Sequence, residues 1–498
     1  MSRVQLSPIV ALRQRDVTCP RSSGAAGLQH DGPELVQTAS LSWTPLGFAK
    51  GLGPRQGLHD NVRTQVAGWS TGAVGTRRHC VADCVRELGG GRMTKTVCVV
   101  FCNRCPRSQV ETARLFSYFE ANGSRISKSL ARSDLVVVSA CAVAEGVEQE
   151  SLRGICIADR KRRRGSRLVV VGCVAGILED RLREAFGAIV VPPVRMSELD
   201  SIVDAAIPIA TIRDPNDIAP HLRRAPGPFG RATRSRLHHV VVLARDALGA
   251  HRLPERRHTR GFASLEPTRD VHSVRVASGC LDECSFCAIR RAEGPLRSKP
   301  LARVMMEFNE GLALGRTEFM LIGTDVGAYG QDIGTNCVSL LESILGRPAD
   351  FRLTILDSHP RWLVHFEDSL IPLLAANASR IRLLMIPVQS GSQRMLELMR
   401  RGHSAAELTH SLSALRTAAP GLALGTHVLV GFPGESDRDF QDTLRLLDVV
   451  AFERVGIYRY SERPQTDAPG LPDKVPDDVK ARRVSHLLKK LPNAAAVE

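Results

Sequence analysis

Long apolar runs are missing from this sequence of 498 residues, and no segment approaches the roughly 20 apolar residues that a membrane-spanning helix needs. A secretion signal is missing too, because the short apolar patch SPIVAL runs directly into RQR without a small-residue cleavage site. These absences exclude an integral membrane protein and argue against export, so we expect a cytoplasmic protein. Hydrophobic residues make up 43% of the chain, which is enough to bury the cores of roughly two to four domains.

The sequence does contain 13 cysteines and a formal net charge of +15. In a reducing compartment, clustered cysteines indicate metal or redox chemistry more often than disulfides. The positive charge suits a polyanionic partner such as RNA. An arginine-rich, GC-biased genome explains the charge equally well, because arginine greatly outnumbers lysine.

Residues 1–92 show no sustained periodicity and are broken repeatedly by Gly, Ser and Pro. We interpret them as a disordered or mis-annotated extension. Met93 precedes the first convincing strand, and the preceding ELGGGR implies purine-rich DNA of the kind found at ribosome-binding sites. We therefore hypothesise that translation starts at Met93, which N-terminal mass spectrometry of the native protein would test.

The segment 93–212 alternates strand-like and helix-like stretches and is predicted to be one α/β domain. Apolar, Val-rich runs predict strands at 96–101, 134–140, 167–172 and 187–191. Helix-like segments such as 108–121 and 147–163 fall between them. Continuous Val-rich strands joined by helical crossovers are typical of a parallel sheet that is covered on both faces.

A linker or insertion rich in Pro, Arg and His is expected at 213–270, and the strand and helix alternation then resumes six times. The predicted strands are 271–277, 318–323, 351–356, 381–388, 422–430 and 454–459. Such a series predicts a partial (β/α)6 barrel at 271–465. A helix at 477–490 and a tail make up the C-terminal part, 466–498, and no further domain is expected.

Three cysteines follow the first predicted barrel strand in the stretch SGCLDECSFCAIR, where Cys280, Cys284 and Cys287 have the spacing Cys-x3-Cys-x2-Cys. Three thiolates in one tight loop can hold three irons of a four-iron four-sulfur cubane and leave the fourth iron open. The open iron can be chelated by the amine and carboxylate of S-adenosylmethionine (SAM). The alternative is a zinc site, but structural zinc wants four ligands and no neighbouring Cys-x2-Cys pair supplies the fourth.

This motif, with the aromatic Phe286 just before the last cysteine, resembles that of the radical SAM superfamily. The resemblance implies that the segment LIGTDVGAYG, which contains Asp325, binds the methionyl part of SAM. The segments IPVQSGS, with Gln389, and VLVGFPGES, with Gly431, end two later strands and are expected on the same rim. The glycines would let the backbone approach a ligand closely, although Gly and Pro after a strand are also ordinary turn residues.

A second set of cysteines lies in the N-terminal domain, where Cys105 follows the first strand, and Cys141 and Cys173 end the second and third. Open α/β sheets bind ligands at the carboxyl ends of their strands, so these thiolates could hold a second cluster. Cysteine is commonly buried, so packing could also account for them. We interpret Cys98, Cys102 and Cys156 as core or bystander residues, with Cys102 as an alternative to Cys105.

The two sets together resemble the radical SAM methylthiotransferase family over about residues 93–490. The motifs that carry the resemblance are CPRS, RSDLVVVSAC, GCVAG, GCLDECSFCAI, DVGAYG, IPVQSGSQRMLELMRR, VGFPGE, RVGIYRYS and LPDKVP. The resemblance implies two [4Fe-4S] clusters and SAM as cofactors, with Cys280, Cys284 and Cys287 binding the SAM cluster. Cys105, Cys141 and Cys173 would bind an auxiliary cluster that carries the sulfur. No catalytic side chain is identified.

The chain departs from the family pattern at several positions. Ser108 stands where Asn is usual, and Ser139 and Ala140 replace Asn-Thr before Cys141. After the SAM-cluster loop, Arg290 replaces a proline and Glu293 an arginine. The C-terminal TRAM domain of the family is not found.

The resemblance implies as substrate either a tRNA adenosine beside the anticodon or an aspartate of a ribosomal protein, and we favour tRNA because IPVQSGS and SERPQT look like the tRNA branches. RVG before YRYS looks more like the protein branch. The basic run Arg160–Arg164, with Arg167, could contact phosphates but is more simply a solvated helix end. An electron donor such as flavodoxin or ferredoxin is expected.

Two other functions remain open at this point. A one-cluster radical SAM enzyme acting on a peptide or small molecule would cleave SAM without transferring sulfur. A zinc-dependent RNA-binding protein would not be an enzyme, and anaerobic purification would distinguish it because iron–sulfur proteins are brown.

Overall fold

The protein is described by a computed structural model that covers residues 95–102, 105–222 and 271–497. Residues 91–498 belong to one compact unit. The interpretations of residues 1–92 and of 223–270 in the expected linker lie outside the described residues. No helix among the described residues has the length and apolar character to cross a membrane.

The first part of the chain forms a five-stranded parallel sheet with the order β2-β1-β3-β4-β5. Its strands are β1 (Thr96–Phe101), β2 (Arg125–Ile126), β3 (Leu135–Ser139), β4 (Arg167–Val171) and β5 (Ile189–Val191). Its helices are α1 (Pro106–Ala121), α2 (Glu145–Lys161), α3 (Cys173–Ile177), α4 (Glu179–Phe186), α5 (Glu198–Val203) and α6 (Ala219–Leu222). The predicted parallel α/β domain is confirmed.

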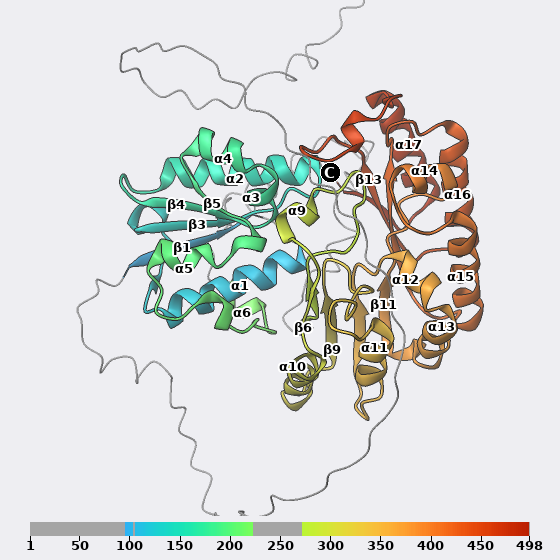
Figure 1. Ribbon diagram of the computed structural model, residues 1–498, viewed down its shortest axis with the longest axis horizontal. Coiled ribbons are helices and arrows are strands. Elements are labelled where there is room, and N and C mark those ends of the chain that lie inside the picture. The colour runs from blue at the N-terminus through green and yellow to red at the C-terminus, as the bar shows by residue number, and fades with distance from the viewer. Residues whose placement is uncertain (1–94, 103–104, 223–270, 498) are drawn as a thin grey trace, which may run out of the picture. The chain divides into compact units, whose positions relative to one another are not determined.

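Alternating side chains of these strands build a separate core on each face of the sheet. Val136 and Val170 pack with residues of α2 and α4, whereas Val137 and Val169 pack with residues of α1 and α5. In Figure 1, α2 and α4 accordingly lie on one side of the sheet, and α1 and α5 lie on the other. Burial on both faces explains why these strands are continuous Val-rich runs without polar alternation.

The second part forms a seven-stranded parallel sheet with the order β14-β13-β12-β11-β10-β9-β6. Its strands are β6 (Val271–Arg275), β9 (Glu318–Ile322), β10 (Arg352–Ile355), β11 (Ile381–Met385), β12 (Leu424–Val430), β13 (Arg454–Arg459) and β14 (Ala494–Val497). A short antiparallel pair joins β7 (Ala277–Ser278) to β8 (Arg297–Ser298). All six predicted barrel strands are present, and β14 is an additional strand within the predicted tail.

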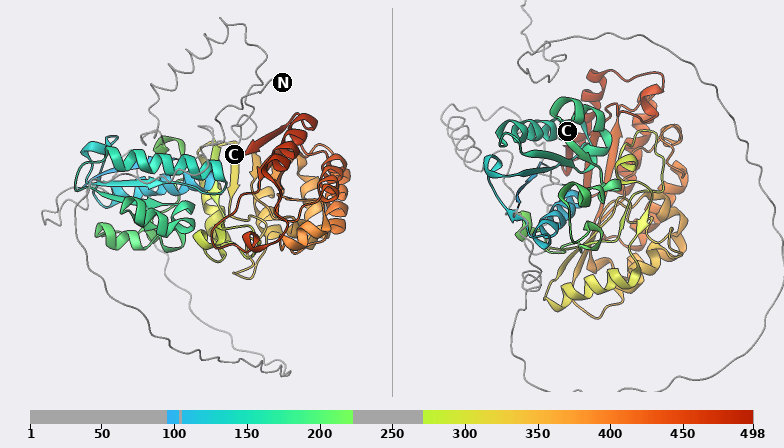
Figure 2. Two further views of the ribbon diagram at one scale, coloured as in Figure 1. Left: turned by 90° about the horizontal axis from the view of Figure 1, so that it is seen from above. Right: turned by 60° about the vertical axis from the view of Figure 1, so that its left-hand side comes forward.

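Helices cover the outer side of this sheet, as Figures 1 and 2 show. They are α10 (Leu301–Ala313), α11 (Cys337–Leu345), α12 (Pro360–His365), α13 (Glu367–Ala376), α14 (Gln393–Leu398), α15 (Ala405–Ala418), α16 (Asp437–Val450) and α17 (Asp477–Lys490). The short helix α9 (Ile289–Glu293) follows the Cys280 loop. The main core, which includes Phe308, Leu321 and Leu412, fills the space between strands and helices. This architecture is the predicted partial barrel.

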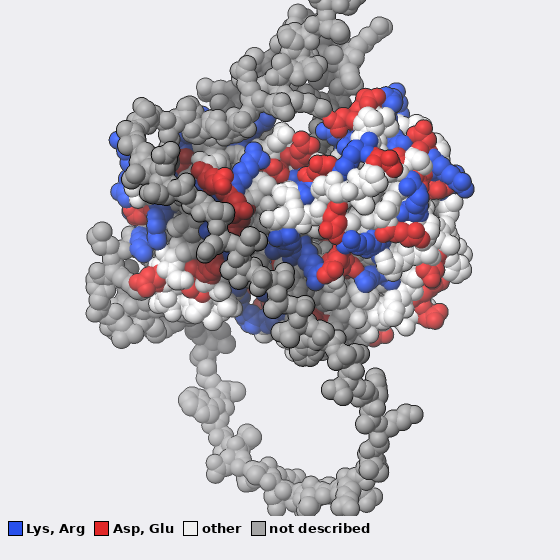
Figure 3. All heavy atoms as spheres, turned by 45° about the horizontal axis from the view of Figure 1, so that its top comes forward, with Lys and Arg blue, Asp and Glu red and all other residues white. Residues whose placement is uncertain are grey.

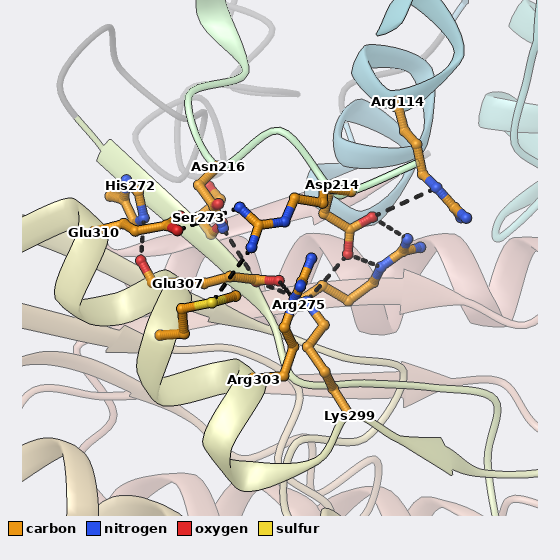
Figure 4. Close-up of polar contacts among 12 residues, drawn as sticks. Arg114, Asp214, Asn216, His272, Ser273, Arg275, Lys299, Arg303, Glu307 and Glu310 are labelled. Carbon is orange, nitrogen blue, oxygen red and sulfur yellow. Dashed lines mark hydrogen bonds and ion pairs between the residues drawn. The ribbon is translucent and has the colours of Figure 1, made fainter. Parts of the chain in front are cut away.

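Helix α1 of the first part packs against the inner face of the barrel sheet. Val110 of α1 shares a buried cluster with Met320 of β9 and Met385 of β11. Beside this apolar contact, Arg275 of β6 forms an ion pair with Glu111 of α1 at 2.8 Å and a second one with Asp214. Figure 4 shows the carboxylate of Asp214 directed toward Arg275, Lys299 and Arg114. These contacts fix α1, and therefore the start of α1 at Cys105, against β6, which leads to Cys280.

Candidate active site

A cavity of about 560 Å³ lies at the carboxyl ends of strands from both sheets. Its lining includes five of the six predicted cysteine ligands, namely Cys105, Cys141, Cys280, Cys284 and Cys287. The strand ends of a parallel sheet meet at one edge, and two such edges face the same space here. The two predicted cluster sites therefore open onto one cavity.

Cys105 is the last residue before α1, and Cys141 is the second residue after β3. Pro106 at the first helical position starts α1 without needing a hydrogen-bond donor, so the turn at Cys105 is fixed locally. The backbone of Cys141 is held by Ser151 of α2, whose hydroxyl donates to the Cys141 carbonyl at 2.7 Å and accepts from its N–H at 3.1 Å. Both cysteines are thus positioned by the ends of regular elements.

Cys173 is brought to this pair by a close approach of two strands. Gly172 has φ +92°, and a Cβ atom there would lie 2.3 Å from the Ala140 carbonyl oxygen, so only glycine fits. The Cys173 thiol hydrogen-bonds the Cys141 sulfur, and this bond lowers the pKa of Cys141 to about 7. On its other side, the Cys173 sulfur lies 3.5 Å from Glu293 Oε1 of α9. Cys173 therefore completes the first set, although it does not line the cavity.

The second set lies on the loop between β7 and α9. A Cβ atom on Gly279, which has φ +74°, would lie 1.9 Å from the Pro295 carbonyl oxygen, so the loop is held tightly against the following segment. The Cys280 N–H donates to the Gly294 carbonyl at 3.2 Å, and the Cys287 N–H donates to the Cys284 carbonyl at 3.1 Å. The antiparallel pair of β7 and β8 fixes the base of the loop.

Hydrogen bonds to sulfur are already formed in this loop. The Asp282 N–H donates to the Cys280 sulfur at 3.3 Å. The guanidinium of Arg401, which is buried, donates through Nη1 to the Cys284 sulfur at 3.3 Å and through Nη2 to the Pro387 carbonyl at 2.7 Å. Such donors stabilise thiolates and tune the potential of an iron–sulfur cluster.

The cysteines interpreted as core or bystander residues have the expected surroundings. Cys98 and Cys102 are buried in the core between the first sheet and α2, and Cys156 packs against the same core. Of Cys102 and Cys105, only Cys105 lines the cavity. The structure therefore favours Cys105 over Cys102 as the third residue of the first set.

Phe286 and Asp325, two predicted SAM contacts, line the cavity. Phe286 packs edge-to-face against Phe432 with the ring centroids 6.4 Å apart. The buried carboxylate of Asp325 accepts hydrogen bonds from the Gly327 N–H, the His359 N–H and the Trp362 indole at 2.7–3.0 Å. Burial raises the pKa of Asp325 to about 6 in spite of these donors. Asp325 thus ties the loop after β9 to the start of α12.

Gln389 lines the cavity, but Gly431 does not. Gln389 has φ +65° and pairs with β12, because its N–H donates to His427 and its carbonyl accepts from Leu429. Gly431 has φ +77°, its N–H donates to Glu435 Oε2 at 2.7 Å, and a Cβ atom there would lie 2.3 Å from Lys480 Cγ. Gly431 is therefore held by a hydrogen bond within its turn and packs closely against Lys480 of α17.

Several cavity residues were not singled out from the sequence. They are Arg107, Asp357, His427, Tyr458, Arg463, Ala496 and Val497. Tyr458 and Arg463 lie in the segments RVGIYRYS and SERPQT, and Arg107 lies in CPRS. Their position within these motifs is the sequence feature that could have identified them as cavity residues. His427 packs edge-to-face on Tyr458 at 5.1 Å between centroids.

The donor set fits iron–sulfur clusters. Burial raises the pKa of Cys280 to about 12 and also raises the pKa of Cys105 and Cys287, which favours their protonated thiols. A bound metal cation would displace these protons and stabilise the thiolates. Among the described residues, no three His, Cys, Asp or Glu side chains are arranged to hold a single metal ion. In a cubane each thiolate binds a different iron, so its ligands stand farther apart than those of a mononuclear site.

Two family models match the chain. The Radical SAM superfamily model matches residues 274–447, which include most of the barrel, from β6 into α16. The model of the uncharacterized protein family UPF0004 matches residues 100–191, which span the first sheet with its cysteines. The matched ranges therefore coincide with the two parts that meet at the cavity.

Curated relatives match both parts at once. The ribosomal protein uS12 methylthiotransferase RimO of Thermus thermophilus is 31% identical over 398 residues, which cover 77% of this chain and 80% of that protein. The tRNA-2-methylthio-N(6)-dimethylallyladenosine synthase of Syntrophobacter fumaroxidans is 30% identical and covers 77% of each chain. The chain belongs to the radical SAM methylthiotransferase family. Methylthiotransferases of this family are enzymes that use SAM and two [4Fe-4S] clusters.

The fold of this methylthiotransferase-family chain is also found in a solved structure. The radical SAM methyltransferase TsrM of Kitasatospora setae has a TM-score of 0.51 at 17% identity and covers 76% of this chain and 77% of its own. At this identity the likeness concerns the fold alone. The predicted family and fold class are confirmed, whereas the six cysteine ligands stay predictions that the geometry fits.

Proposed function

We propose that this enzyme inserts a methylthio group at an unactivated C–H carbon, with its SAM cluster on Cys280, Cys284 and Cys287 and its auxiliary cluster on Cys105, Cys141 and Cys173. The observation that carries the proposal is the single cavity onto which both cysteine sets open. In this reaction the first cluster with SAM supplies a radical and the second supplies the sulfur. Since both act on the same carbon, they must face one substrate site.

The chain's own residues would position the reactants in this cavity. Asp325 holds the loop after β9 in place through its three accepted hydrogen bonds. Gln389 and Asp357, both in the left-handed backbone conformation, present polar side chains to the cavity. Ala496 and Val497 of β14 close one side of it with small apolar side chains. We propose that these groups orient SAM and substrate and exclude water from the radical.

We propose that the substrate is a side chain of a ribosomal protein. We also propose that the enzyme is cytoplasmic and that flavodoxin or ferredoxin is its electron donor. The Protochlamydia amoebophila relative, 27% identical over 77% of this chain, is a uS12 methylthiotransferase, as is the Thermus thermophilus relative. Where grey atoms do not cover the face in Figure 3, basic and acidic side chains of the described residues are interspersed, whereas a polyanion favours a broad basic patch. Within the basic run, Arg162 and Arg163 are paired with Asp159 and Asp134.

A tRNA adenosine is the second candidate, and the features IPVQSGS and SERPQT favour it. The Syntrophobacter fumaroxidans relative carries this activity in its name. Most of the excess of basic over acidic residues lies in segments outside the described residues, so the charge of the whole chain, +15, is compatible with RNA. The two candidates are separated by mass spectrometry of ribosomal proteins and of tRNA nucleosides from a strain lacking the gene and from the complemented strain.

Anaerobic reconstitution tests the two-cluster assignment. We expect about eight irons per chain in the wild type and about four in each of two triple variants, one with Cys105, Cys141 and Cys173 changed to Ala and one with Cys280, Cys284 and Cys287 changed to Ala. The first variant should still produce 5′-deoxyadenosine from SAM but form no methylthio product. A matched control is Cys98→Ala, which removes a core thiol and should leave iron unchanged.

Two results would contradict this assignment. An unchanged iron content in the first triple variant would show that Cys105, Cys141 and Cys173 bind no cluster, as in a one-cluster radical SAM enzyme. A colourless, zinc-loaded protein after anaerobic purification would favour the RNA-binding alternative. The wild type is expected to form both S-adenosylhomocysteine and 5′-deoxyadenosine, because the sulfur must be methylated before it is transferred.

A further inference from the structure

Arg107 is a half-buried cation with two buried guanidinium nitrogens that lack hydrogen-bond partners among the described residues. It is the second residue of α1 and lines the cavity next to Cys105. Its Nε and Nη1 atoms are buried and make no hydrogen bond within the described part of the chain. Buried guanidinium donors without acceptors are strongly unfavourable, so such a group normally awaits a ligand.

The other arginines that line the cavity each donate to at least one acceptor. Arg290 pairs with Glu283, and Arg463 pairs with Glu148. Arg401 donates to the Cys284 sulfur and to the Pro387 carbonyl. Nε of Arg401 is also buried without a partner among the described residues, so Arg107 differs from the other three in having two such nitrogens, Nε and Nη1.

The position of Arg107 indicates which anion it awaits. Its strongest charged neighbours are Cys105, Glu293 and Cys173, so the guanidinium lies among the thiols of the auxiliary set. The first turn of α1 contains no acidic residue, and a cation at a helix N-terminus opposes the helix dipole. An anion bound between the guanidinium and the helix start would accept hydrogen bonds from the unpartnered nitrogens and would also offset the unfavourable interaction of Arg107 with the helix dipole. Three thiolates on a four-iron cluster would leave one iron open to a further ligand at this place.

We propose that Arg107 is a positioning residue that binds a small anionic sulfur species, hydrosulfide or methanethiolate, at the Cys105–Cys141–Cys173 set. This inference rests on the proposed function, because it assumes a cluster on those cysteines. Nε–H and Nη1–H donate to the sulfur anion and keep it at the open iron while the substrate carbon is activated. Arginine suits this role because its guanidinium is always charged and presents several donors in a fixed geometry.

The test measures anion binding to the auxiliary cluster alone. The full chain with Cys280, Cys284 and Cys287 changed to Ala serves as the background, and its reduced cluster is titrated with sodium methanethiolate while the electron paramagnetic resonance spectrum is recorded. We expect Arg107→Gln to raise the Kd for methanethiolate at least about tenfold. Arg107→Lys keeps the charge but not the donor geometry, so its Kd should lie between the two.

Two controls separate this role from a structural one. Titration with neutral imidazole should give the same Kd in Arg107→Gln and in the background, because a lost charge does not weaken a neutral ligand. Arg290→Gln, which removes a cavity cation that already has a carboxylate partner, should leave the methanethiolate Kd within about twofold.

Equal methanethiolate affinity in Arg107→Gln and in the background, with about four irons in both, would overturn the inference. If Arg107→Gln assembled no cluster, Arg107→Lys would decide, and a Kd equal to that of the background would again overturn it. Failure of the proposed function looks different, since the background itself would then take up no iron.

Discussion

Replacing Asp214 should both destabilise the protein and uncouple its two cysteine sets. Asp214 accepts a hydrogen bond of 2.9 Å from Arg275 Nε and lies 3.3 Å from Lys299 Nζ, and its side chain is only 6% exposed. In Asp214→Ala, the Arg275 guanidinium, 17% exposed, keeps only Glu111 as a partner. Breaking a buried ion pair on one side costs about 3–5 kcal/mol, because the remaining charge stays buried. Urea unfolding of the full chain measures this loss.

A matched control lies on the same segment. Asp217 pairs with Arg316 at 2.9 Å, but both side chains are more exposed, at 38% and 26%. An exposed pair contributes about 0–1 kcal/mol, so Asp217→Ala should change the free energy of unfolding little. If Asp214→Ala and Asp217→Ala differed by less than about 1 kcal/mol, the reasoning from burial would be refuted.

The network also has a functional consequence. It connects α1, which Cys105 directly precedes, with β6, which leads to Cys280, as Figure 4 shows in part. In the absence of urea, under conditions where Asp214→Ala is folded, the variant should still form 5′-deoxyadenosine. Its rate of methylthio transfer should fall about tenfold, which corresponds to an increase of about 1.4 kcal/mol in the activation barrier. Equal losses of both products would instead indicate general unfolding.

The pH dependence follows from the same carboxylate. Burial by itself would raise the pKa of Asp214, but Arg275 and Lys299 outweigh it and hold the pKa below its ordinary value. A carboxyl with a lowered pKa in the folded state stabilises the protein above its unfolded pKa of about 3.9, and this stability is lost as the pH falls. The wild type should therefore lose more stability than Asp214→Ala when the pH is lowered below about 4.

The remaining predictions concern two glycines and one buried ion pair. Gly279→Ala should abolish SAM cleavage, because the new Cβ atom would lie 1.9 Å from a carbonyl oxygen. Gly172→Ala, whose Cβ atom would lie 2.3 Å from a carbonyl oxygen, should lower only the iron content of the auxiliary site. Gly123→Ala is the control: this residue has φ +74° but open space around it, so urea unfolding should show a loss of only about 1–2 kcal/mol. Arg483→Met should cost about 3–5 kcal/mol, because it leaves the buried Glu435 carboxylate unpaired. Burial raises the pKa of Glu435 to about 7, so the stability of the wild type should decline as the pH rises through about 7. Urea unfolding below and above this pH measures the decline, and an unchanged free energy of unfolding would contradict the reasoning.

Much of the fold could be predicted because the strands are strongly patterned. Val-rich runs such as 134–140 became β3 (Leu135–Ser139), and the predicted helix at 477–490 coincides with α17. Strand β14 was not predicted, because its sequence is Ala-Ala-Ala-Val and alanine is a poor strand former. It forms because β13 offers a free edge, with Val455 opposite Ala494 and Tyr458 opposite Val497. Tertiary pairing here outweighs local preference.

The candidate site was predictable only where chemistry is local. Cys280, Cys284 and Cys287 lie within eight residues of one another, so their spacing alone predicts a shared ligand. Arg107 and Glu293 lie far apart along the chain on α1 and α9, and packing of α3 against α9 brings Glu293 to Cys173. No pattern of period two or 3.6 encodes such a meeting.

The departures from the family pattern gain meaning once their contacts are known. Ser108 and Ser139, which each stand where Asn is usual, lie with their hydroxyl oxygens 3.3 Å apart, and Thr112 donates to Ser139 at 2.8 Å. Two changes that looked independent along the sequence therefore form one contact at the base of the Cys105 and Cys141 turns.

The same argument extends to the loop after the SAM-cluster cysteines. Arg290, in place of a proline, is neutralised by Glu283 within its own loop. Glu293, in place of an arginine, lies 3.5 Å from the Cys173 sulfur and near Arg107. The positive charge that the family places at position 293 is thus absent here, and Arg107 supplies one from the opposite side of the auxiliary cysteines. Because the sign of the charge around the thiols governs how firmly an anionic ligand is held, we expect these departures to affect sulfur delivery under the proposed assignment of the auxiliary cysteines.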